Sequence, residues 1–131
     1  MIQRFTFGCP LPTESVVLLV EPAAAAVPYL TAEPDGSWSF SLAEDAVVYG
    51  LGEMPRGINK RGWHYVTDNT DESHHGENRL SYYGAHNFLL IDGGAGRSVF
   101  GVFVDFPGKV FYDIGYTRHD RLTFRTEEPD Y

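Results

Sequence analysis

The fold is indicated by the segment Pro34-Asp35-Gly36-Ser37-Trp38-Ser39-Phe40-Ser41-Leu42. It begins with turn residues and continues with a strict alternation of polar and apolar side chains. Proline fixes φ, aspartate caps the turn and glycine accepts a positive φ, so the first three residues predict a tight turn. After the turn, Trp38, Phe40 and Leu42 alternate with three serines. This period of two gives one apolar and one polar face and predicts a half-buried β-strand.

Short runs of the same kind recur along the chain and are separated by Gly and Pro turns. Strands are predicted over residues 2–7, 15–20, 46–51, 88–91, 99–104, 110–114 and 122–125. The runs at 88–91 and 99–104 flank Asp92-Gly93-Gly94-Ala95-Gly96, which predicts a hairpin. Together with the strand after Gly36, the count comes to about eight or nine strands, as in an antiparallel sandwich.

Helix signals are poor throughout. The chain contains 14 Gly and 8 Pro, which are unfavourable inside helices, and they are spread along its length. The alanine run 23–26 lies between Pro22 and Pro28, so we expect a connection there. Because no long helix separates the strands, a parallel sheet is disfavoured. The sequence therefore predicts an all-β fold, an antiparallel β-sandwich.

Length and charge restrict the function classes. With 131 residues the chain fits a single domain. Ten Lys and Arg against eighteen Asp and Glu give a net charge of −8, which argues against nucleic acid and anionic membranes as partners. The lone Cys9 allows no internal disulfide, and neither a signal peptide nor an apolar run long enough for a membrane span is recognisable. A cytoplasmic protein is expected.

The long irregular stretch 54–81 is the first place to look for chemistry, because such segments in compact domains are usually functional or disordered. Its part 68–77 concentrates carboxylates and imidazoles, and three interpretations stay open: a solvated acidic loop, a sugar site and a metal site. The adjacent His74 and His75 point to opposite sides of an extended chain and lack a His-x-x-x-His spacing. We therefore expect no metal and no cofactor.

Other reactive patterns are weaker. Glu53, Asp71 and Glu77 could be nominated as paired carboxylates of a hydrolase, but no apolar pocket that would raise a carboxyl pKa is implied. Cys9 has no base nearby in sequence and is expected to be a small core residue. Trp63 and Tyr65 alternate at strand spacing and fit a core or a sugar platform equally well.

The segment Gly50-Leu51-Gly52-Glu53 lacks the third glycine and the following helix of a phosphate-binding loop. Its glycines instead predict a β-bulge or a close backbone approach. Glu53 is expected to form structural hydrogen bonds with the loop, with Arg56 or Lys60 as partners.

Five motifs in order resemble the N-terminal region of glycoside hydrolase family 31, with the closest similarity to bacterial α-glucosidases. They are Tyr49-Gly50-Leu51-Gly52-Glu53, Gly57-Ile58-Asn59-Lys60-Arg61-Gly62, Asn69-Thr70-Asp71, Tyr83-Gly84-Ala85-His86-Asn87-Phe88 and Phe100-Gly101-Val102-Phe103-Val104-Asp105. The resemblance extends from Ile2 to about Thr126.

The resemblance implies an antiparallel β-sandwich of the galactose-mutarotase type, which in this family precedes a large (β/α)8 barrel. Both catalytic aspartates of the retaining mechanism lie in that barrel, and the chain ends at Tyr131. We therefore expect residues 1–131 to form one N-terminal domain without either catalytic carboxylate. Its parent would be an α-glucosidase-like hydrolase, and the domain would be inert alone.

The resemblance also assigns a role to the acidic loop. In this family a loop of the sandwich reaches over the barrel mouth and supplies a carboxylate to the sugar site. The matching residue is Asp71, with Asn69, Thr70 and Glu72 as supporting neighbours, and the ligand would be an α-glucoside oligosaccharide.

Two further expectations follow. The acidic loop and an aromatic content of 15% are also compatible with a self-standing carbohydrate-binding module, which is the alternative function. The tail after Thr126 lacks the short strand usual in the family. The missing strand would leave a sheet edge unpaired and allow a homo-oligomer to form.

Overall fold

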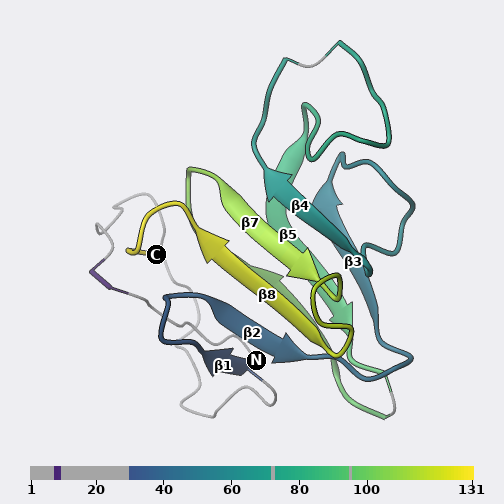
Figure 1. The fold of residues 1–131 in the computed structure, drawn as a ribbon, viewed down its shortest axis with the longest axis vertical. Coiled ribbons are helices and arrows are strands. Elements are labelled where there is room, and N and C mark those ends of the chain that lie inside the picture. Colours follow the sequence, from purple (N-terminus) through teal and green to yellow (C-terminus); the bar gives the residue numbers. More distant parts are fainter. Residues whose placement is uncertain (1–7, 10–29, 72, 95) are drawn as a thin grey trace, which may run out of the picture.

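The computed structural model describes residues 8–9, 30–71, 73–94 and 96–131. In this part of the chain all regular structure is β, arranged as two antiparallel sheets (Figure 1). The predicted all-β antiparallel sandwich is confirmed. The strands predicted over 2–7 and 15–20 and the connection over 23–26 lie outside the described residues.

The described residues form eight strands in two sheets. Their bounds are β1 Leu30–Ala32, β2 Trp38–Ser41, β3 Val47–Gly52, β4 Trp63–Thr67, β5 Ala85–Asp92, β6 Val99–Phe103, β7 Val110–Ile114 and β8 Arg121–Thr126. The five-stranded sheet has the order β1-β2-β8-β7-β4, and the three-stranded sheet has the order β3-β5-β6.

The strands after the Pro34 turn and from residue 46 onward match the predictions, including the β5–β6 hairpin. The exception is β4, which lies inside the stretch 54–81 that was predicted to be irregular. The strand forms because residues 63–67 pair along their whole length with β7, from Trp63 opposite Ile114 to Thr67 opposite Val110. A partner strand nearly fifty residues away cannot be read from local turn signals.

The core lies between the two sheets and is built from alternate residues of each strand. The most deeply buried side chains are Tyr65, Leu51, Leu89, Ile91, Ile114, Leu122, Val48 and Val110. Burying an aliphatic side chain of this size stabilises a fold by about 1.5–3 kcal/mol. These side chains form one cluster with Phe40 and Leu42 of the predicted apolar face, and Trp38 packs partly buried against it.

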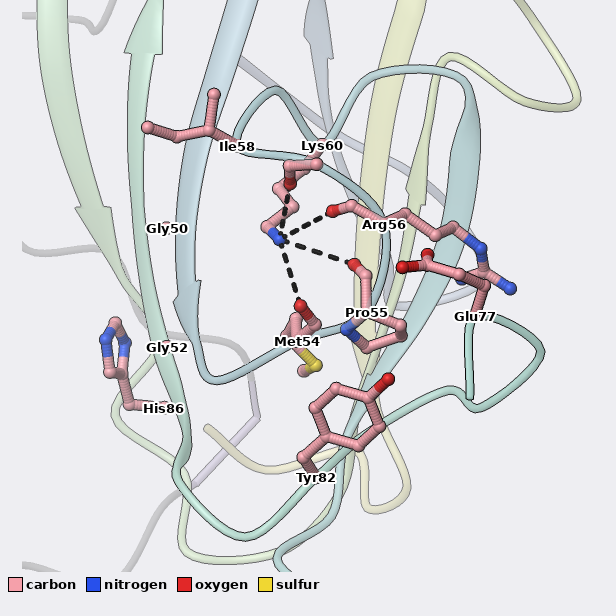
Figure 2. A pocket seen from close by; sticks show the side chains of 11 residues that line it. Gly50, Gly52, Met54, Pro55, Arg56, Ile58, Lys60, Glu77, Tyr82 and His86 are labelled. Carbon is pink, nitrogen blue, oxygen red and sulfur yellow. Dashed lines mark hydrogen bonds between the residues drawn. The ribbon is translucent and has the colours of Figure 1, made fainter. Parts of the chain in front are cut away.

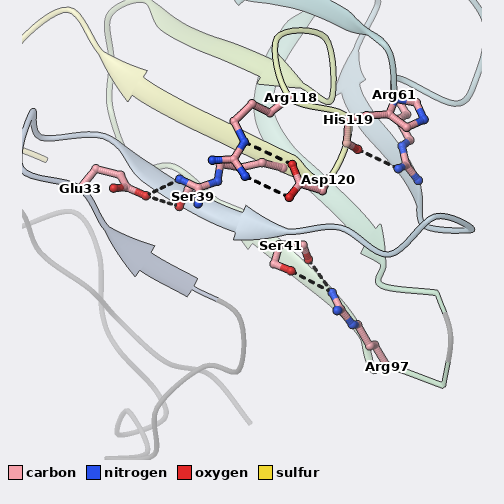
Figure 3. A network of polar contacts seen from close by, with 9 residues as sticks. Glu33, Ser39, Ser41, Arg61, Arg97, Arg118, His119 and Asp120 are labelled. Carbon is pink, nitrogen blue, oxygen red and sulfur yellow. Dashed lines mark hydrogen bonds and ion pairs between the residues drawn. The ribbon is translucent and has the colours of Figure 1, made fainter.

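The polar face of β2 is less exposed than the alternation suggests, since Ser39 is only 3% exposed. Its hydroxyl donates a hydrogen bond to Glu33 Oε1 at 2.6 Å, and the same oxygen accepts one from Arg121 Nη1 at 2.9 Å (Figure 3). A charged pair therefore covers the outer face of the sheet at this point, which satisfies the buried hydroxyl.

The edge expected after Thr126 does not lie at the last strand. Strand β8 lies inside the five-stranded sheet, bonded to β2 on one side and to β7 on the other. Among the described residues the edges of this sheet are β1 and β4, and the expected unpaired edge and homo-oligomer stay predictions. No helix among the described residues has the length and apolarity to cross a membrane.

A β-bulge interrupts the pairing of β3 with β5 between Gly50 and Gly52, as the glycine pattern predicted. Gly50 has φ +118°, and a Cβ there would clash with the Phe88 carbonyl oxygen. The extra residue re-aims the following side chain, so that both Val48 and Leu51 point into the core and are fully buried. The bulge thus ends β3 and starts the loop beside the candidate site.

Replacing Gly50 with alanine is expected to destabilise the domain by more than about 2 kcal/mol, because it adds a positive-φ penalty and a backbone clash. The control is Gly57→Ala, where a Cβ meets nothing within 4 Å. Urea unfolding followed by tryptophan fluorescence measures both variants. Equal stability of the two would contradict the account of the bulge.

Candidate functional site

The loop between β4 and β5 carries the predicted sugar-binding residues and is anchored at its base. Asp68 pairs with Lys109 Nζ at 3.0 Å, and the Asp68 amide donates to Ser81 Oγ at 3.2 Å. The two ends of the loop are therefore fastened to each other and to Lys109, which directly precedes β7. In Figure 1 the loop projects beyond the ends of the strands.

The second half of the loop is held by aromatic contacts. The His75 ring lies 4.8 Å from the Tyr82 ring and 5.1 Å from the Tyr83 ring, centroid to centroid. The Tyr82 hydroxyl donates to the Gly76 carbonyl at 3.0 Å. His75 is thus a packing residue here, and the described residues contain no group of three or more His, Cys, Asp or Glu placed to hold a metal ion.

The predicted site residues lie in the first half of the same loop. Asn69, Thr70 and Asp71 are exposed, and Glu72 lies outside the described residues. No described residue forms a hydrogen bond or ion pair with the Asp71 carboxylate. The structure therefore presents this carboxylate to solvent from an anchored loop, and its role toward a sugar stays a prediction.

A cleft of about 520 Å³ lies next to this loop (Figure 2). Glu77 and Tyr82 of the loop form one side, and the segment after β3 forms the other. Its lining comprises Gly50, Gly52, Met54, Pro55, Arg56, Gly57, Ile58, Lys60, Glu77, Tyr82 and His86. The cleft combines a carboxylate, a phenol, an imidazole and apolar side chains, which are the groups that bind polyhydroxylated ligands.

Lys60 organises the wall of the cleft from inside. It is only 5% exposed, and its Nζ lies 3.5, 3.4, 3.3 and 2.9 Å from the carbonyl oxygens of Met54, Pro55, Arg56 and Gly57. Burial lowers the pKa of this ammonium, and the Glu77 carboxylate acts in the opposite direction. The loop 54–57 is therefore wrapped around one cation.

Arg61 likewise holds the neighbouring loops by donating hydrogen bonds to their backbone carbonyl groups. Its Nη1 donates to the carbonyl oxygens of residues 43, 44 and 46 at 2.8, 2.8 and 2.9 Å, and its Nη2 donates to that of His119 at 2.8 Å. Asn59 Oδ1 accepts from the Val48 and Arg61 amides. Reasoning from residue types overlooked this anchor, and only the family motif 57–62 marked the segment.

Trp63 and Tyr65, for which the sequence allowed either a core position or a sugar platform, have different roles. Tyr65 is 1% exposed and belongs to the core, whereas Trp63 is 45% exposed at the edge of β4. The Arg56 guanidinium lies 4.5 Å from the Trp63 ring centroid and 5.6 Å from that of Tyr65. The platform interpretation therefore fails for Tyr65, and a cation covers part of Trp63.

Two smaller predictions are corrected. Glu53 bonds neither Arg56 nor Lys60 but the backbone of Gly84, accepting from its amide at 3.2 Å and donating its own amide to the Gly84 carbonyl at 3.0 Å. Cys9 is exposed rather than part of the core, and its amide donates to Asp130 Oδ1. Both partners lie far away in sequence, so local patterns could not identify them.

Comparison with known proteins identifies a family. Residues 23–113 match the glycosyl hydrolase 31 N-terminal galactose mutarotase-like domain. No curated protein sequence matches the chain.

Solved structures share the fold. A cycloalternan-degrading enzyme from Trueperella pyogenes superposes with a TM-score of 0.60 at 22% identity, covering 67% of this chain and 12% of that enzyme. A GH31 dextranase from Flavobacterium johnsoniae complexed with glucose gives 0.62 at 23% identity, with 81% and 13% covered. A cycloalternan-forming enzyme from Listeria monocytogenes in complex with a pentasaccharide substrate gives 0.60 at 21% identity, with 72% and 8% covered. The chain thus spans only a small part of the length of each.

Lys60→Met is expected to destabilise the domain by about 2 kcal/mol, because it removes the donor from one buried and three partly buried carbonyl groups. The matched control is Lys109→Met, which removes an exposed lysine with a single acidic partner and is expected to leave global stability nearly unchanged. Urea unfolding gives both values. Equal midpoints for the two variants would contradict the assignment of Lys60 as the anchor of the cleft.

Proposed function

The chain belongs to the family of glycosyl hydrolase 31 N-terminal galactose mutarotase-like domains, and we propose that it supplies the Asp71 carboxylate to the sugar site of an α-glucosidase-like retaining hydrolase. In this proposal the proton donor and the nucleophile come from a separate barrel domain. Asp71 accepts hydrogen bonds from glucosyl hydroxyls, and Asn69, Thr70 and Glu72 support it. No cofactor takes part.

The observation that carries the proposal is the state of Asp71. Its carboxylate is exposed and has no partner among the described residues, while the loop that bears it is fastened by Asp68, Ser81 and Lys109. An unpaired carboxylate on an anchored loop loses little conformational freedom on meeting a ligand. Such preorganised contacts can strengthen in a transition state and raise the rate of the chemical step.

The ligand class is supported by the structural neighbours. The solved structures include the cycloalternan-degrading enzyme in complex with isomaltose and a dextranase variant complexed with isomaltotriose. These sugars are ligands of those two proteins. Together with the family assignment they support an α-glucoside oligosaccharide as the substrate of the whole protein to which this chain would belong.

The alternative is a self-standing carbohydrate-binding module, favoured by the cleft between the two loops. Glu77, Tyr82 and His86 give this cleft hydrogen-bonding groups, and Met54 and Ile58 give it apolar surface. The two functions differ in what the isolated chain does. A hydrolase domain without its barrel lacks half of the sugar site, whereas a binding module is complete.

The decisive variant is Asp71→Asn in the polypeptide that includes the barrel. The proposal expects kcat/KM on an α-glucoside to fall by about a hundredfold, because one charged acceptor at the sugar is lost. The matched control is Asp105→Asn, an exposed carboxylate outside the loop, for which no change is expected. Unchanged kinetics for Asp71→Asn would refute the role of this carboxylate.

The isolated chain is expected to be inert. Its turnover of an aryl α-glucoside should equal a blank, and calorimetric titration with maltose and isomaltose should show binding no tighter than about millimolar, because association entropy opposes weak contacts. Turnover that is lost in Asp71→Ala would overturn the inert-domain proposal. Binding tighter than that limit, abolished by changing Trp63, would favour the binding module.

A further inference from the structure

A second cavity lies on the outer face of the five-stranded sheet and has no part in the proposed Asp71 site. This groove has a volume of about 850 Å³ and is lined by residues of β4, β7 and β8 and by the turn at 33–37. We propose that the groove is a separate binding site for an uncharged oligosaccharide. This inference does not depend on the role of Asp71.

The strand registers place two rows of side chains side by side along the groove. In the first row Thr123 lies opposite Asp113, and Asp113 lies opposite His64. All of these side chains are polar. Paired residues on one face of an antiparallel sheet are about 5 Å apart, so the row forms a continuous line of hydrogen-bonding groups.

The second row runs parallel to the first, two residues further along each strand. Here Arg125 lies opposite Phe111, and Phe111 lies opposite Val66. Leu80, which is 47% exposed, extends the row, since its carbonyl accepts from the Val66 amide at 3.4 Å. The rows are about 7 Å apart. Arg125 already covers a face of the Phe111 ring. A pyranose ring lying along the groove would therefore contact the Val66 and Leu80 side chains and would point its hydroxyls at the polar row.

Two polar groups in the groove have hydrogen-bonding capacity that no described residue uses. The Arg125 guanidinium lies 4.3 Å from the Phe111 ring centroid, and no described residue accepts a hydrogen bond from it. The partly buried Thr123 hydroxyl likewise has no hydrogen-bond partner in the described part of the chain. Stacking restrains the arginine, so its N–H groups are held as donors beside an apolar surface, which is how proteins recognise sugar hydroxyls.

Asp113 supplies a fixed acceptor between these donors. Its carboxylate accepts from the Tyr116 amide at 2.9 Å and the Thr117 amide at 3.2 Å, and it lies 3.1 Å from His64 Nε2. Burial raises the pKa of Asp113, but these hydrogen bonds outweigh it, and the pKa is lowered overall. The carboxylate is therefore ionised and oriented at neutral pH.

The charge balance selects an uncharged ligand. Three carboxylates, Glu33, Asp35 and Asp113, line the groove together with three guanidinium groups, Arg118, Arg121 and Arg125. The whole chain, in contrast, has a net charge of −8. A groove with balanced charges on an acidic protein favours neither an anion nor a cation, and a neutral polyol can exchange hydrogen bonds with both kinds of group.

The test is a ¹H–¹⁵N NMR titration of the 131-residue chain with isomaltotriose and, separately, with maltotriose. Amide shifts are expected on β7 and β8, around Phe111, Asp113 and Thr123. Thr123→Val keeps the shape but removes the hydroxyl, and it should weaken binding about fivefold, as should Arg125→Ala. Asp105→Asn, which changes an exposed carboxylate outside the groove, should leave the affinity unchanged.

Each contrary outcome is distinct. Absence of shifts with both sugars overturns the site. Shifts confined to the loop 68–84 and lost in Asp71→Ala overturn it in favour of the Asp71 site alone. Tighter binding of trigalacturonic acid than of either neutral sugar overturns the assignment of ligand charge. Urea unfolding of Thr123→Val and Arg125→Ala confirms that each variant is folded, and unchanged affinity in both folded variants refutes the proposal.

Discussion

Two consecutive cations, Lys60 and Arg61, hold the loops beside the bulge by donating hydrogen bonds to their backbone carbonyl groups. Buried carbonyls outside a sheet ladder need a donor, and the loops beside the bulge offer several at once. Lys60 gathers those of 54–57, and Arg61 gathers those of the loop before β3 and of His119. The same segment joins the sheets, because the Lys60 amide donates to Val48 of β3 and the Gly62 amide donates to Ile114 of β7.

This anchor determines where the cleft forms. The Gly50 bulge ends β3 and re-aims the chain, Lys60 folds the following loop back on itself, and Glu53 fastens that loop to Gly84 just before β5. The loop that carries Asp71 forms the other side of the cleft through Glu77 and Tyr82. The site is therefore a consequence of two loops held by long-range polar bonds on a rigid pair of sheets, an arrangement typical of functional loops.

The two faces of the five-stranded sheet are used differently. The inner face is part of the apolar core, while the outer face bears paired charges, an arginine stacked on Phe111 and a row of polar side chains. The Glu33–Arg121 pair on this face is partly withdrawn from water, and its members are hydrogen-bonded to each other at 2.9 Å. Carbohydrate recognition by this face and by the Asp71 loop would be two separate uses of one sandwich.

Sequence alone was sufficient for the strands after the Pro34 turn and over 46–51, 88–91, 99–104, 110–114 and 122–125, for the β5–β6 hairpin and for the bulge at Gly50, because period-two alternation, turn chemistry and glycine conformation act between near neighbours. The ordered motifs identified the family. They also located the loop of Asp71. Long-range contacts determine that residues 63–67 form a strand, that Ser39 is buried, that Cys9 is exposed, and that Glu53 bonds Gly84. Each of these features depends on partners distant in sequence. The carbonyl groups bound by Lys60 and Arg61 are backbone atoms, which every residue carries, so residue types cannot identify them as acceptors.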